Sequence, residues 1–266
     1  MNLKAITTEV CALAKETGQF ILNERKNFSY SKVSDKGLNQ LVSYVDIEAE
    51  KKIAAGLSKI VPEAGYITEE NTQAENKDNT LVWVIDPLDG TTNFIHGLPV
   101  YSVSIALMQN GKTVSGVVYE INKDELFSAW KDGGAWLNGE KIQCSAALSL
   151  NDSLLATGFP YYDFKQMDEY LGVLRMLMRE SHGLRRLGSA AVDLAYVACG
   201  RFEGFFEYGL APWDVAAGVL IVEEAGGKVI DFQGAENYIF GKEIIACCAG
   251  IEAEFIRIVK EGFYKS

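Results

Sequence analysis

The amino-acid sequence predicts an α+β fold, and three features of its hydrophobic pattern support that class. Apolar residues recur at helical spacing from about Asn2 to Lys26, which predicts a long amphipathic helix. From Tyr101 to Ile142 apolar and polar residues alternate, as they do along half-buried strands of an antiparallel sheet. In the second half of the chain strand-like and helix-like segments alternate, so a mixed α/β region is expected after the antiparallel sheet.

Shorter elements complete the first half. A helical pattern runs from Ile47 to Lys59, with Asp46 as its expected N-cap. The stretch "AGYITEEN" predicts a short strand that ends in two acids, and "LVWVI" predicts a buried strand that leaves the core at Asp86. Asn110-Gly111 and Asn138-Gly139 are strong signals for tight turns, so hairpins are expected at both places.

The second half is predicted to alternate strands with helices. The expected strands are "SLLATGF", "RFEGFFEY", "KVIDF" and "EIIACCAG". The expected helices are Asp163 to Glu180, "GSAAVDLAYVAC", Pro212 to Ala225, and Ile251 to Glu261, the last one stopping at Gly262. The pattern changes near residues 146–151 without a linker. We therefore expect two closely joined lobes, an N-terminal α+β lobe of residues 1–147 and a C-terminal α/β lobe of residues 148–266.

The composition excludes several classes of protein. Hydrophobic residues make up 48% and charged residues 23% of the 266, as in soluble globular proteins, and no apolar run reaches membrane-spanning length. The N-terminal segment carries charges within its helical pattern, unlike a signal peptide, so we expect a cytoplasmic protein without membrane contact. A net charge of −11 disfavours direct binding of nucleic acid.

The few histidines and the cysteine pattern restrict the metal chemistry. His96 and His182 are too few for a histidine-rich zinc or iron site, and a serine triad would have to use one of them. The five cysteines are odd in number and include no C-x-x-C pair, so neither a disulfide framework nor a zinc knuckle is expected. A metal would be held mainly by oxygen atoms, which favours Mg²⁺, with Mn²⁺ as a substitute.

The stretch "DPLDGTTN" places two acids directly after the predicted "LVWVI" strand. Pro87 is expected to hold Asp86 extended and to force a turn, and Gly90 permits tight backbone geometry. The residues that follow favour helix caps, so free backbone N–H groups could point back toward Asp86 and Asp89. Carboxylates suit a metal and such N–H groups suit a phosphate; the alternative interpretation is an Asp-rich turn without such a role.

Acids stand at the ends of apolar elements at two further places. Glu69 and Glu70 come after "YIT", and Asp214 stands in "LAPWDVAAGVLIVEEAGG". Asp214 by itself would most often be a charge that stabilises the first turn of a helix. If these acids converge with Asp86 and Asp89, however, they would repel one another unless a cation or a proton neutralises them. Convergence would therefore imply a metal site.

Two stretches, "WVIDPLDGTTNFIHGLP" and "WDVAAGVLIVEEAGG", resemble the signature stretches of the inositol monophosphatase family of lithium-sensitive, magnesium-dependent phosphatases. Further matches are "TEE", "LVSYVD", "GSAA" and "FFEYG", so the resemblance extends over nearly the whole chain. It implies the sugar-phosphatase fold, a layered α-β-α-β-α sandwich with the site between two lobes. It also implies a homodimer.

The resemblance implies a set of metal ligands and of catalytic groups. Glu69, Asp86 and the carbonyl of Leu88 would hold one Mg²⁺, and Asp86, Asp89 and Asp214 a second, with two or three ions in all. Glu69 is chosen over Glu70 on sequence register. Thr91, hydrogen-bonded to Asp46, and Glu69 would orient and activate the attacking water.

The resemblance likewise implies the contacts to substrate. Backbone N–H groups of Gly90 and Thr91 would hold the phosphate, and Lys36 would lie near the metal and the phosphate. The groups expected to contact substrate hydroxyls are Asp89, Gly188, Ser189, Ala190 and Glu207.

The implied activity is Mg²⁺-dependent hydrolysis of inositol monophosphate or of a similar polyol or sugar phosphate. Alternative substrates within the family are histidinol phosphate, nucleotide 3′-phosphates and fructose bisphosphate. The residues Thr92-Asn93-Phe94 after "DPLDGT" resemble the inositol monophosphatases more than the nucleotide phosphatases. An alternative of another class is a regulatory, protein-binding role in a transcription complex, because some bacterial relatives of the family act in that way.

Overall fold

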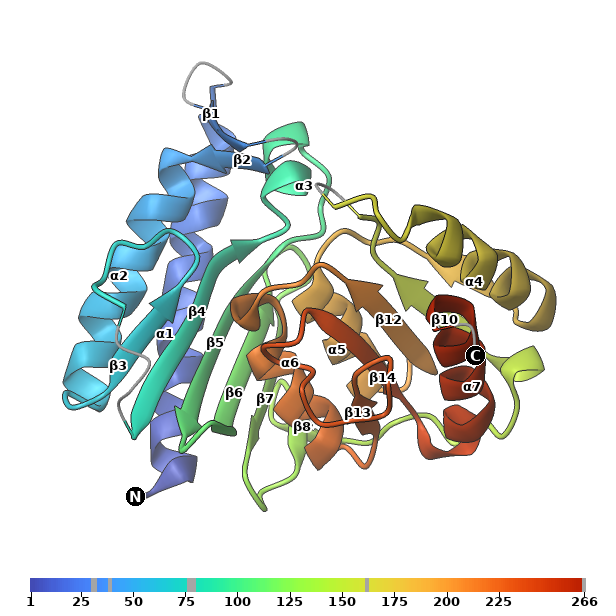
Figure 1. Cartoon of the computed structure of the whole chain (residues 1–266). Coiled ribbons are helices and arrows are strands. Elements are labelled where there is room, and N and C mark those ends of the chain that lie inside the picture. The colour runs from blue at the N-terminus through green and yellow to red at the C-terminus, as the bar shows by residue number, and fades with distance from the viewer. Residues whose placement is uncertain (30–32, 38–39, 76–79, 161–162, 265–266) are drawn as a thin grey trace.

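The computed structural model describes residues 1–29, 33–37, 40–75, 80–160 and 163–264, and the side chains of residues 34–37, 40 and 41 are outside that description. Within these ranges helices and the two larger sheets form five alternating layers, in which each of these two sheets has helices on both faces (Figure 1). This arrangement confirms the predicted α+β class and the layered α-β-α-β-α sandwich. The division into lobes 1–147 and 148–266 stays a prediction.

In the described part of the chain the larger sheet has seven strands. In spatial order they are β3 (Gly65–Thr68), β4 (Leu81–Asp89), β5 (Ser102–Gln109), β6 (Lys112–Glu120), β7 (Glu125–Trp130), β8 (Ala135–Leu137) and β9 (Glu140–Ile142). β3 and β4 are parallel, and each later pair is antiparallel. Positive φ angles at Asn110, Gly111, Asn138 and Gly139 form the two predicted tight turns, which join β5 to β6 and β8 to β9.

The smaller sheet has five strands among the described residues. Their order is β11 (Gly183–Arg185), β10 (Leu154–Thr157), β12 (Gly204–Tyr208), β14 (Glu243–Cys247) and β13 (Lys228–Ile230). β10 is parallel to both neighbours, whereas β14 is antiparallel to both. β11 was not predicted, because three residues at a sheet edge are too few to show a period. A separate two-stranded sheet of β1 (Val33–Gly37) and β2 (Gln40–Ser43), also not predicted, precedes the second helix.

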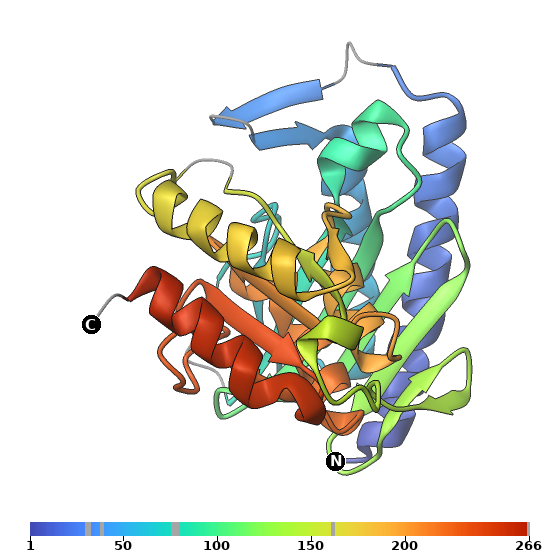
Figure 2. The same cartoon turned by 90° about the vertical axis from the view of Figure 1, so that its right-hand side faces the viewer.

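The helices fall into three layers. α1 (Leu3–Lys26) and α2 (Tyr44–Ile60) cover the outer face of the larger sheet, and α5 (Ala190–Ala198) and α6 (Pro212–Glu224) lie between the sheets. α4 (Met167–Glu180) and α7 (Glu252–Phe263) lie side by side beyond the smaller sheet (Figure 2). Short elements complete the chain: α3 (Thr91–His96) directly after β4, and the 3-10 turns η2 (Leu150–Asp152) and η3 (Ala249–Ile251).

Several predicted helix ends differ from the structure, and three of the differences have a clear physical cause. α2 begins at Tyr44, because the Ser43 hydroxyl accepts the Val45 N–H and caps it, while Asp46 is the third helical residue. α4 begins at Met167 rather than at Asp163, whose carboxylate instead accepts the N–H of Lys165.

The third end concerns Gly262, at which α7 does not stop. α7 continues to Phe263. A Cβ on Gly262 would lie 2.2 Å from a methyl group of Val173 on α4. This glycine is therefore required for close packing between the two helices and not for ending one of them.

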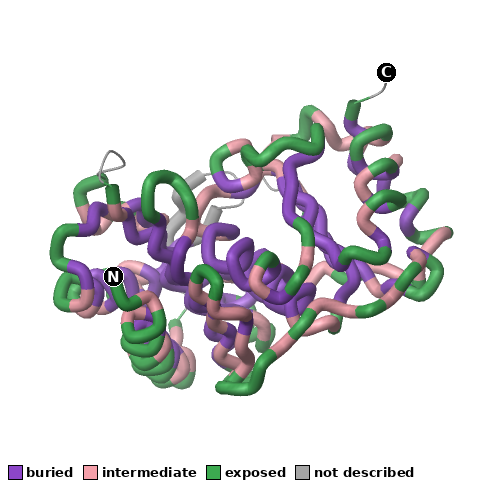
Figure 3. The backbone as a smooth tube through the Cα atoms, turned by 90° about the horizontal axis from the view of Figure 1, so that it is seen from below, coloured by how far each residue is buried: buried purple, intermediate pink, exposed green. Residues whose placement is uncertain are grey.

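Three apolar cores separate the layers. One fills the space between the larger sheet and α1 and α2, the second surrounds α5 and α6, and the third lies between the smaller sheet and α4 and α7. Figure 3 shows the central elements as largely buried, with the exposed residues on the outer elements. All five cysteines are free thiols, and none of the described helices combines the length and the apolarity needed to cross a bilayer.

Candidate active site

The two acids of β4 lie on one face of the larger sheet because the strand contains a bulge. Asp86 pairs with Ser104 and Asp89 with Ser102, so three steps along β4 match two steps along β5. In a regular strand, residues three positions apart point to opposite faces. The extra residue restores the alternation, and both carboxylates face α5 and α6.

Local hydrogen bonding and packing stabilise this bulge. The Leu88 N–H donates to Asp86 Oδ1 over 2.9 Å, and the Leu88 side chain is fully buried in the core below α1 and α2. Pro87 has no N–H and is tolerated where the ladder is interrupted. The expectation that Pro87 turns the chain out of the strand was wrong, since β4 continues to Asp89.

A third carboxylate reaches the same place from α6. Asp86, Asp89 and Asp214 offer oxygen atoms that all lie within 4.8 Å of one another. Asp214 is the third residue of α6, and its Oδ2 accepts the Ala211 N–H over 2.6 Å. Because α6 packs on β4 and β5, its first turn brings Asp214 to the end of β4.

Burial and crowding raise the pKa values of these carboxyls. For Asp86 burial is the main cause, followed by the charges of Glu69, Asp89 and Asp214. Burial likewise raises the pKa of Asp214, and it raises that of Asp89 to about 6 against hydrogen bonds that favour the charged form. A divalent cation would neutralise these charges, so the oxygen-only cluster is suited to a hard metal such as Mg²⁺.

Glu69 enters the site from the loop after β3, and Glu50 on α2 holds that loop in place. Glu69 is half-buried, lines the pocket and shares a hydrogen bond with Asp86. The fully buried carboxylate of Glu50 accepts the Glu70 N–H at 2.7 Å, the Thr72 N–H at 2.8 Å and the Thr72 hydroxyl at 2.7 Å. The Glu70 backbone thus anchors the loop that presents Glu69.

Asp46 lies one turn before Glu50 on α2 and connects the helix cap to Thr91. Its Oδ2 accepts the N–H and the hydroxyl of Ser43 at 2.9 and 2.6 Å, and its Oδ1 accepts the Thr91 hydroxyl at 2.8 Å. The Thr91 oxygen also lies 3.0 Å from the Leu88 carbonyl, but its single proton favours the carboxylate, which is the stronger acceptor. The lone pairs of Thr91 Oγ1 are then able to accept a hydrogen bond from a water molecule.

The pKa of Asp46 follows the same contacts. Burial raises it above the ordinary range, while the hydrogen bonds from Ser43 and Thr91 oppose the rise.

Gly90 and Gly188 allow the backbone at the start of α3 to lie close to the backbone of the loop before α5. Gly90 has φ +98°, and a Cβ there would lie 3.0 Å from the Val100 carbonyl oxygen and 3.2 Å from that of Gly188. Asn93 fixes the contact, because its amide group donates to the carbonyls of Val100 and Leu187 at 2.8 Å each. The residues that begin α3 therefore line the pocket opposite the start of α5.

Asp89 joins the larger sheet to α5. Its Oδ2 accepts the Ser189 hydroxyl at 2.6 Å and the Ala191 N–H at 2.8 Å. Ser189 also caps α5 by accepting the Val192 N–H at 3.3 Å. These contacts fix the distance between Asp89 and the first turn of α5.

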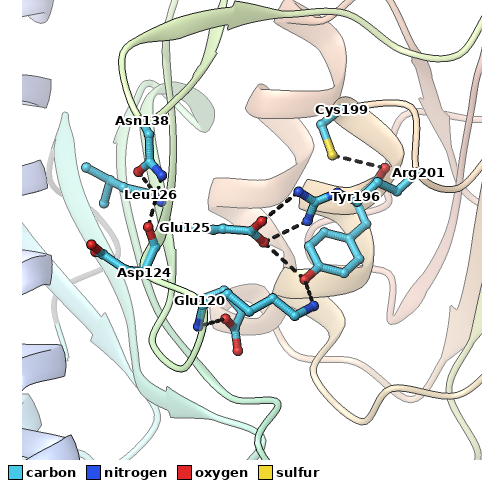
Figure 4. A network of polar contacts seen from close by, with 9 residues as sticks. Glu120, Asp124, Glu125, Leu126, Asn138, Tyr196, Cys199 and Arg201 are labelled. Carbon is cyan, nitrogen blue, oxygen red and sulfur yellow. Dashed lines mark hydrogen bonds and ion pairs between the residues drawn. The ribbon is translucent and has the colours of Figure 1, made fainter.

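A polar network fixes the other end of α5 (Figure 4). Glu125 at the start of β7 accepts two hydrogen bonds from Arg201 at 2.7 and 2.6 Å and one from the Tyr196 hydroxyl at 3.2 Å. Lys123 donates to the same hydroxyl. With Asp89 at one end and Glu125 at the other, α5 is attached to the larger sheet at both ends.

A cavity of about 320 Å³ lies at these element ends. Among the predicted residues its lining includes Glu69, Asp89, Gly90, Thr91, Gly188, Ser189, Ala190, Glu207 and Asp214. Asp46, Asp86 and Leu88 are buried and do not line the cavity themselves. Asp46 and Leu88 each contact Thr91, and Asp86 shares a hydrogen bond with Glu69. Lys36 belongs to β1, and its side chain lies outside the described residues.

Three pocket or support residues were missed by sequence reasoning. Asp193 on α5 and Arg186 before it line the cavity with Glu207 of β12, and Glu50 holds the Glu69 loop. Burial raises the pKa of Glu207 to about 8, and the Arg186 charge opposes the rise. The available signals were an acid inside the apolar run "AAVDLAYVA" for Asp193, and an acid four residues after Asp46 for Glu50.

The fold and the site together define a layered α+β protein with a buried, oxygen-rich pocket of the kind that holds a divalent cation. The model of the inositol monophosphatase family matches residues 2–261, and the chain belongs to that family.

Individual relatives are similar over most of their length. The chain is 46% identical to the Nus factor SuhB of Escherichia coli over 233 residues, which are 88% of this chain and 87% of the relative. It is 39% identical to the inositol-1-monophosphatase of Mesorhizobium japonicum over 261 residues, 98% of each chain. The crystal structure of suhB from Bartonella henselae superposes with a TM-score of 0.90 at 42% identity, covering 97% of this chain and 99% of that one.

Proposed function

We propose that this protein hydrolyses the phosphate monoester of inositol, or of a similar polyol or sugar, with the help of Mg²⁺. The observation that carries the proposal is the convergence of Asp86, Asp89 and Asp214 beside the start of α3 at one pocket. Hard cations take oxygen ligands, and free N–H groups at a helix start suit phosphate oxygens. Membership of the family and the relative named inositol-1-monophosphatase support the same activity.

The proposed metal ligands follow from this cluster. Glu69, Asp86 and the carbonyl of Leu88 would hold one Mg²⁺, and Asp86, Asp89 and Asp214 a second, with two or three ions in all and Mn²⁺ as a substitute. When bound, such ions polarise a phosphate group and stabilise the leaving oxygen.

The protein's own groups would position the attacking water and the phosphate. Thr91 Oγ1, whose proton is held by Asp46, accepts a hydrogen bond from the water, and a Glu69 carboxylate oxygen takes up the proton that the water loses. The N–H groups of Gly90 and Thr91 would hold phosphate oxygens, and Lys36 would supply positive charge to this region.

The remaining pocket residues would contact the hydroxyl groups of the substrate. These are Asp89, Gly188, Ser189, Ala190 and Glu207, all of which line the cavity. A homodimer is part of the proposal, and light scattering on the purified chain tests it.

The experiment measures phosphate release from inositol 1-phosphate with and without Mg²⁺. Histidinol phosphate, fructose 1,6-bisphosphate and adenosine 3′,5′-bisphosphate complete the panel, and Asp86→Asn is the control. We expect Mg²⁺-dependent turnover that favours inositol 1-phosphate and is lost in the variant while its circular dichroism is unchanged. Turnover of another panel member would replace only the substrate.

A second candidate is the regulatory, protein-binding role, which is favoured by the relatives named Nus factor SuhB. Silence on all four substrates would refute the hydrolase proposal and leave this role. A pull-down that retrieves no component of a transcription complex would refute the regulatory role.

A further inference from the structure

The side chain of Asp193 is buried beside the pocket and has no hydrogen-bond partner among the described residues. It lies on α5, is 1% exposed and lines the cavity. Its Oδ1 is fully covered and bonds to no other described residue. Glu207, which is 6% exposed and lines the same cavity from β12, likewise accepts no hydrogen bond from the described part of the chain.

The other buried carboxyls are satisfied by the protein. Several hydrogen bonds are accepted by each of the carboxyl groups of Asp46, Glu50 and Asp89. At least one is accepted by each of those of Asp86, Glu120, Glu203 and Asp231. Leaving a buried polar group unpaired costs about 1–3 kcal/mol, more when the group is charged. Among the buried carboxylic acids of the described chain, Asp193 and Glu207 are therefore the two left without a hydrogen bond, and both line the same cavity. Single covered atoms without a partner also occur elsewhere, at Trp83 Nε1, Thr113 Oγ1 and Glu169 Oε2.

The charges around the pair restrict the ligand that would fit. Arg186 lines the same cavity, and its charge lowers the pKa of both carboxyls, while burial and their mutual repulsion raise that of Asp193. The guanidinium already supplies positive charge here, so a cationic ligand would compete with it. A neutral hydroxyl both donates and accepts a hydrogen bond, and it can pair with a carboxyl in either protonation state.

We propose that Asp193 is a substrate-binding residue that, beside Glu207, hydrogen-bonds a hydroxyl group of a polyol phosphate and so selects hydroxylated over plain phosphate esters. This inference rests on the proposed function and extends it by naming a group that decides selectivity. Asp193 is not needed to cap α5, because the Ser189 hydroxyl has that role. Removing the carboxyl should therefore change substrate choice and should not lower the stability of the free protein.

The test compares inositol 1-phosphate with cyclohexyl phosphate, which has the same ring without hydroxyls. For Asp193→Ala we expect the kcat/KM for inositol 1-phosphate, divided by that for cyclohexyl phosphate, to fall about tenfold or more. This is the loss typical of a removed hydrogen bond to a charged group. The kcat/KM for cyclohexyl phosphate should stay within about twofold of wild type. Equal losses on both substrates, or an unchanged ratio, would overturn the proposal.

Thermal unfolding without substrate separates binding from a structural role. The Tm of Asp193→Ala should equal or exceed that of wild type, because an unpaired buried acid has been removed. Asp231→Ala is the matched control: Asp231 is also buried, but it accepts the N–H groups of Gln233 and Ala235 and does not line the cavity. That variant should lose stability and keep the substrate ratio. A Tm of Asp193→Ala as low as that of the control would mean a structural role and overturn the proposal.

Failure of the proposed function is distinguishable from failure of this inference. If wild type hydrolyses neither ester, saturation-transfer NMR with myo-inositol decides the role of Asp193, since it reports binding without turnover. Binding to wild type that Asp193→Ala loses would support the inference. Binding that the variant retains, or its absence in wild type, would refute it.

Discussion

The substitution Asp86→Asn should stabilise the metal-free protein and abolish its response to metal. Asn keeps the Oδ1 that accepts the Leu88 N–H at 2.9 Å, and its amide can donate to Glu69. At 4.8 Å and an effective dielectric constant of about 20, two full negative charges repel by about 3.5 kcal/mol. The raised pKa of Asp86 means that part of this repulsion is already relieved by protonation. We therefore expect a gain of about 1–3 kcal/mol in the free energy of unfolding with a chelator.

Addition of Mg²⁺ should stabilise the wild type more than the variant and so narrow or remove the difference between them. A ligand at a hundred times its Kd stabilises the native state by about 2.7 kcal/mol, whereas the variant should gain less than about 0.5 kcal/mol. Urea unfolding with a chelator and with saturating Mg²⁺ measures both terms.

Asp231→Asn is the control for this experiment, because Asp231 is buried outside the cavity and accepts N–H groups that an Asn oxygen can also accept. It should gain nothing in chelator. If Asp86→Asn is less stable than wild type in chelator, or is stabilised equally by Mg²⁺, the electrostatic reasoning about the cluster is refuted.

Three further substitutions test separate parts of the site. Glu50→Ala removes three accepted hydrogen bonds at the edge of the fold, so the free energy of unfolding in urea should fall by about 2–4 kcal/mol. In an activity assay the Mg²⁺ concentration for half-maximal activity should rise, and a normal Mg²⁺ dependence would contradict the support of Glu69 by Glu50. Thr91→Val should lower kcat by about a hundredfold or more with little change in KM, while Thr91→Ser, which keeps the bond to Asp46, should retain most activity; equal losses would argue against a role of the hydroxyl. The pKa of Glu207 is raised to about 8, so its carboxyl holds a proton in the folded state that the unfolded chain releases above the ordinary pKa of 4.5. The stability of the metal-free protein should therefore fall as pH rises from about 5 to 8, and Glu207→Gln should reduce that fall by up to about 5 kcal/mol. An unchanged pH dependence of the free energy of unfolding in urea would refute the assignment.

Elements determined by local sequence could be predicted. The turns at Asn110-Gly111 and Asn138-Gly139 follow from residues that tolerate positive φ, and α1 follows from its apolar period. The start of α2 was missed because Ser43 and Asp46 are both cap-type residues, and only the folded geometry decides which of them precedes the helix. The role of Gly262 was also missed, because it depends on close packing against Val173 of α4, which is distant in the sequence.

The approach of Asp214 to the β4 acids could be expected from their places at the ends of apolar elements, but the way in which β4 presents Asp86 and Asp89 could not. A proline between two acids predicts a turn as readily as a bulge. The pairing with Ser102 and Ser104 decides between them, because β5 continues alongside and the ladder resumes at Asp89. The bulge, not a turn, explains why acids three positions apart share one face.

Asp193 and Asp214 look alike in the sequence, and the fold distinguishes them. Each is an acid near the start of an apolar helix, and in both cases the ordinary interpretation is a charge that stabilises the helix start. Asp214 fits that interpretation in part, because it accepts the Ala211 N–H at the start of its own helix. At α5 the capping role belongs to Ser189, which leaves the burial of Asp193 uncompensated by any contact in the described chain. The pocket satisfies its other buried acids and leaves Asp193 and Glu207 unpaired, so it has room there for hydrogen-bonding groups of a ligand. This difference in pairing, and not the presence of acids alone, is the reason to propose that the substrate's hydroxyl groups bind beside these two residues.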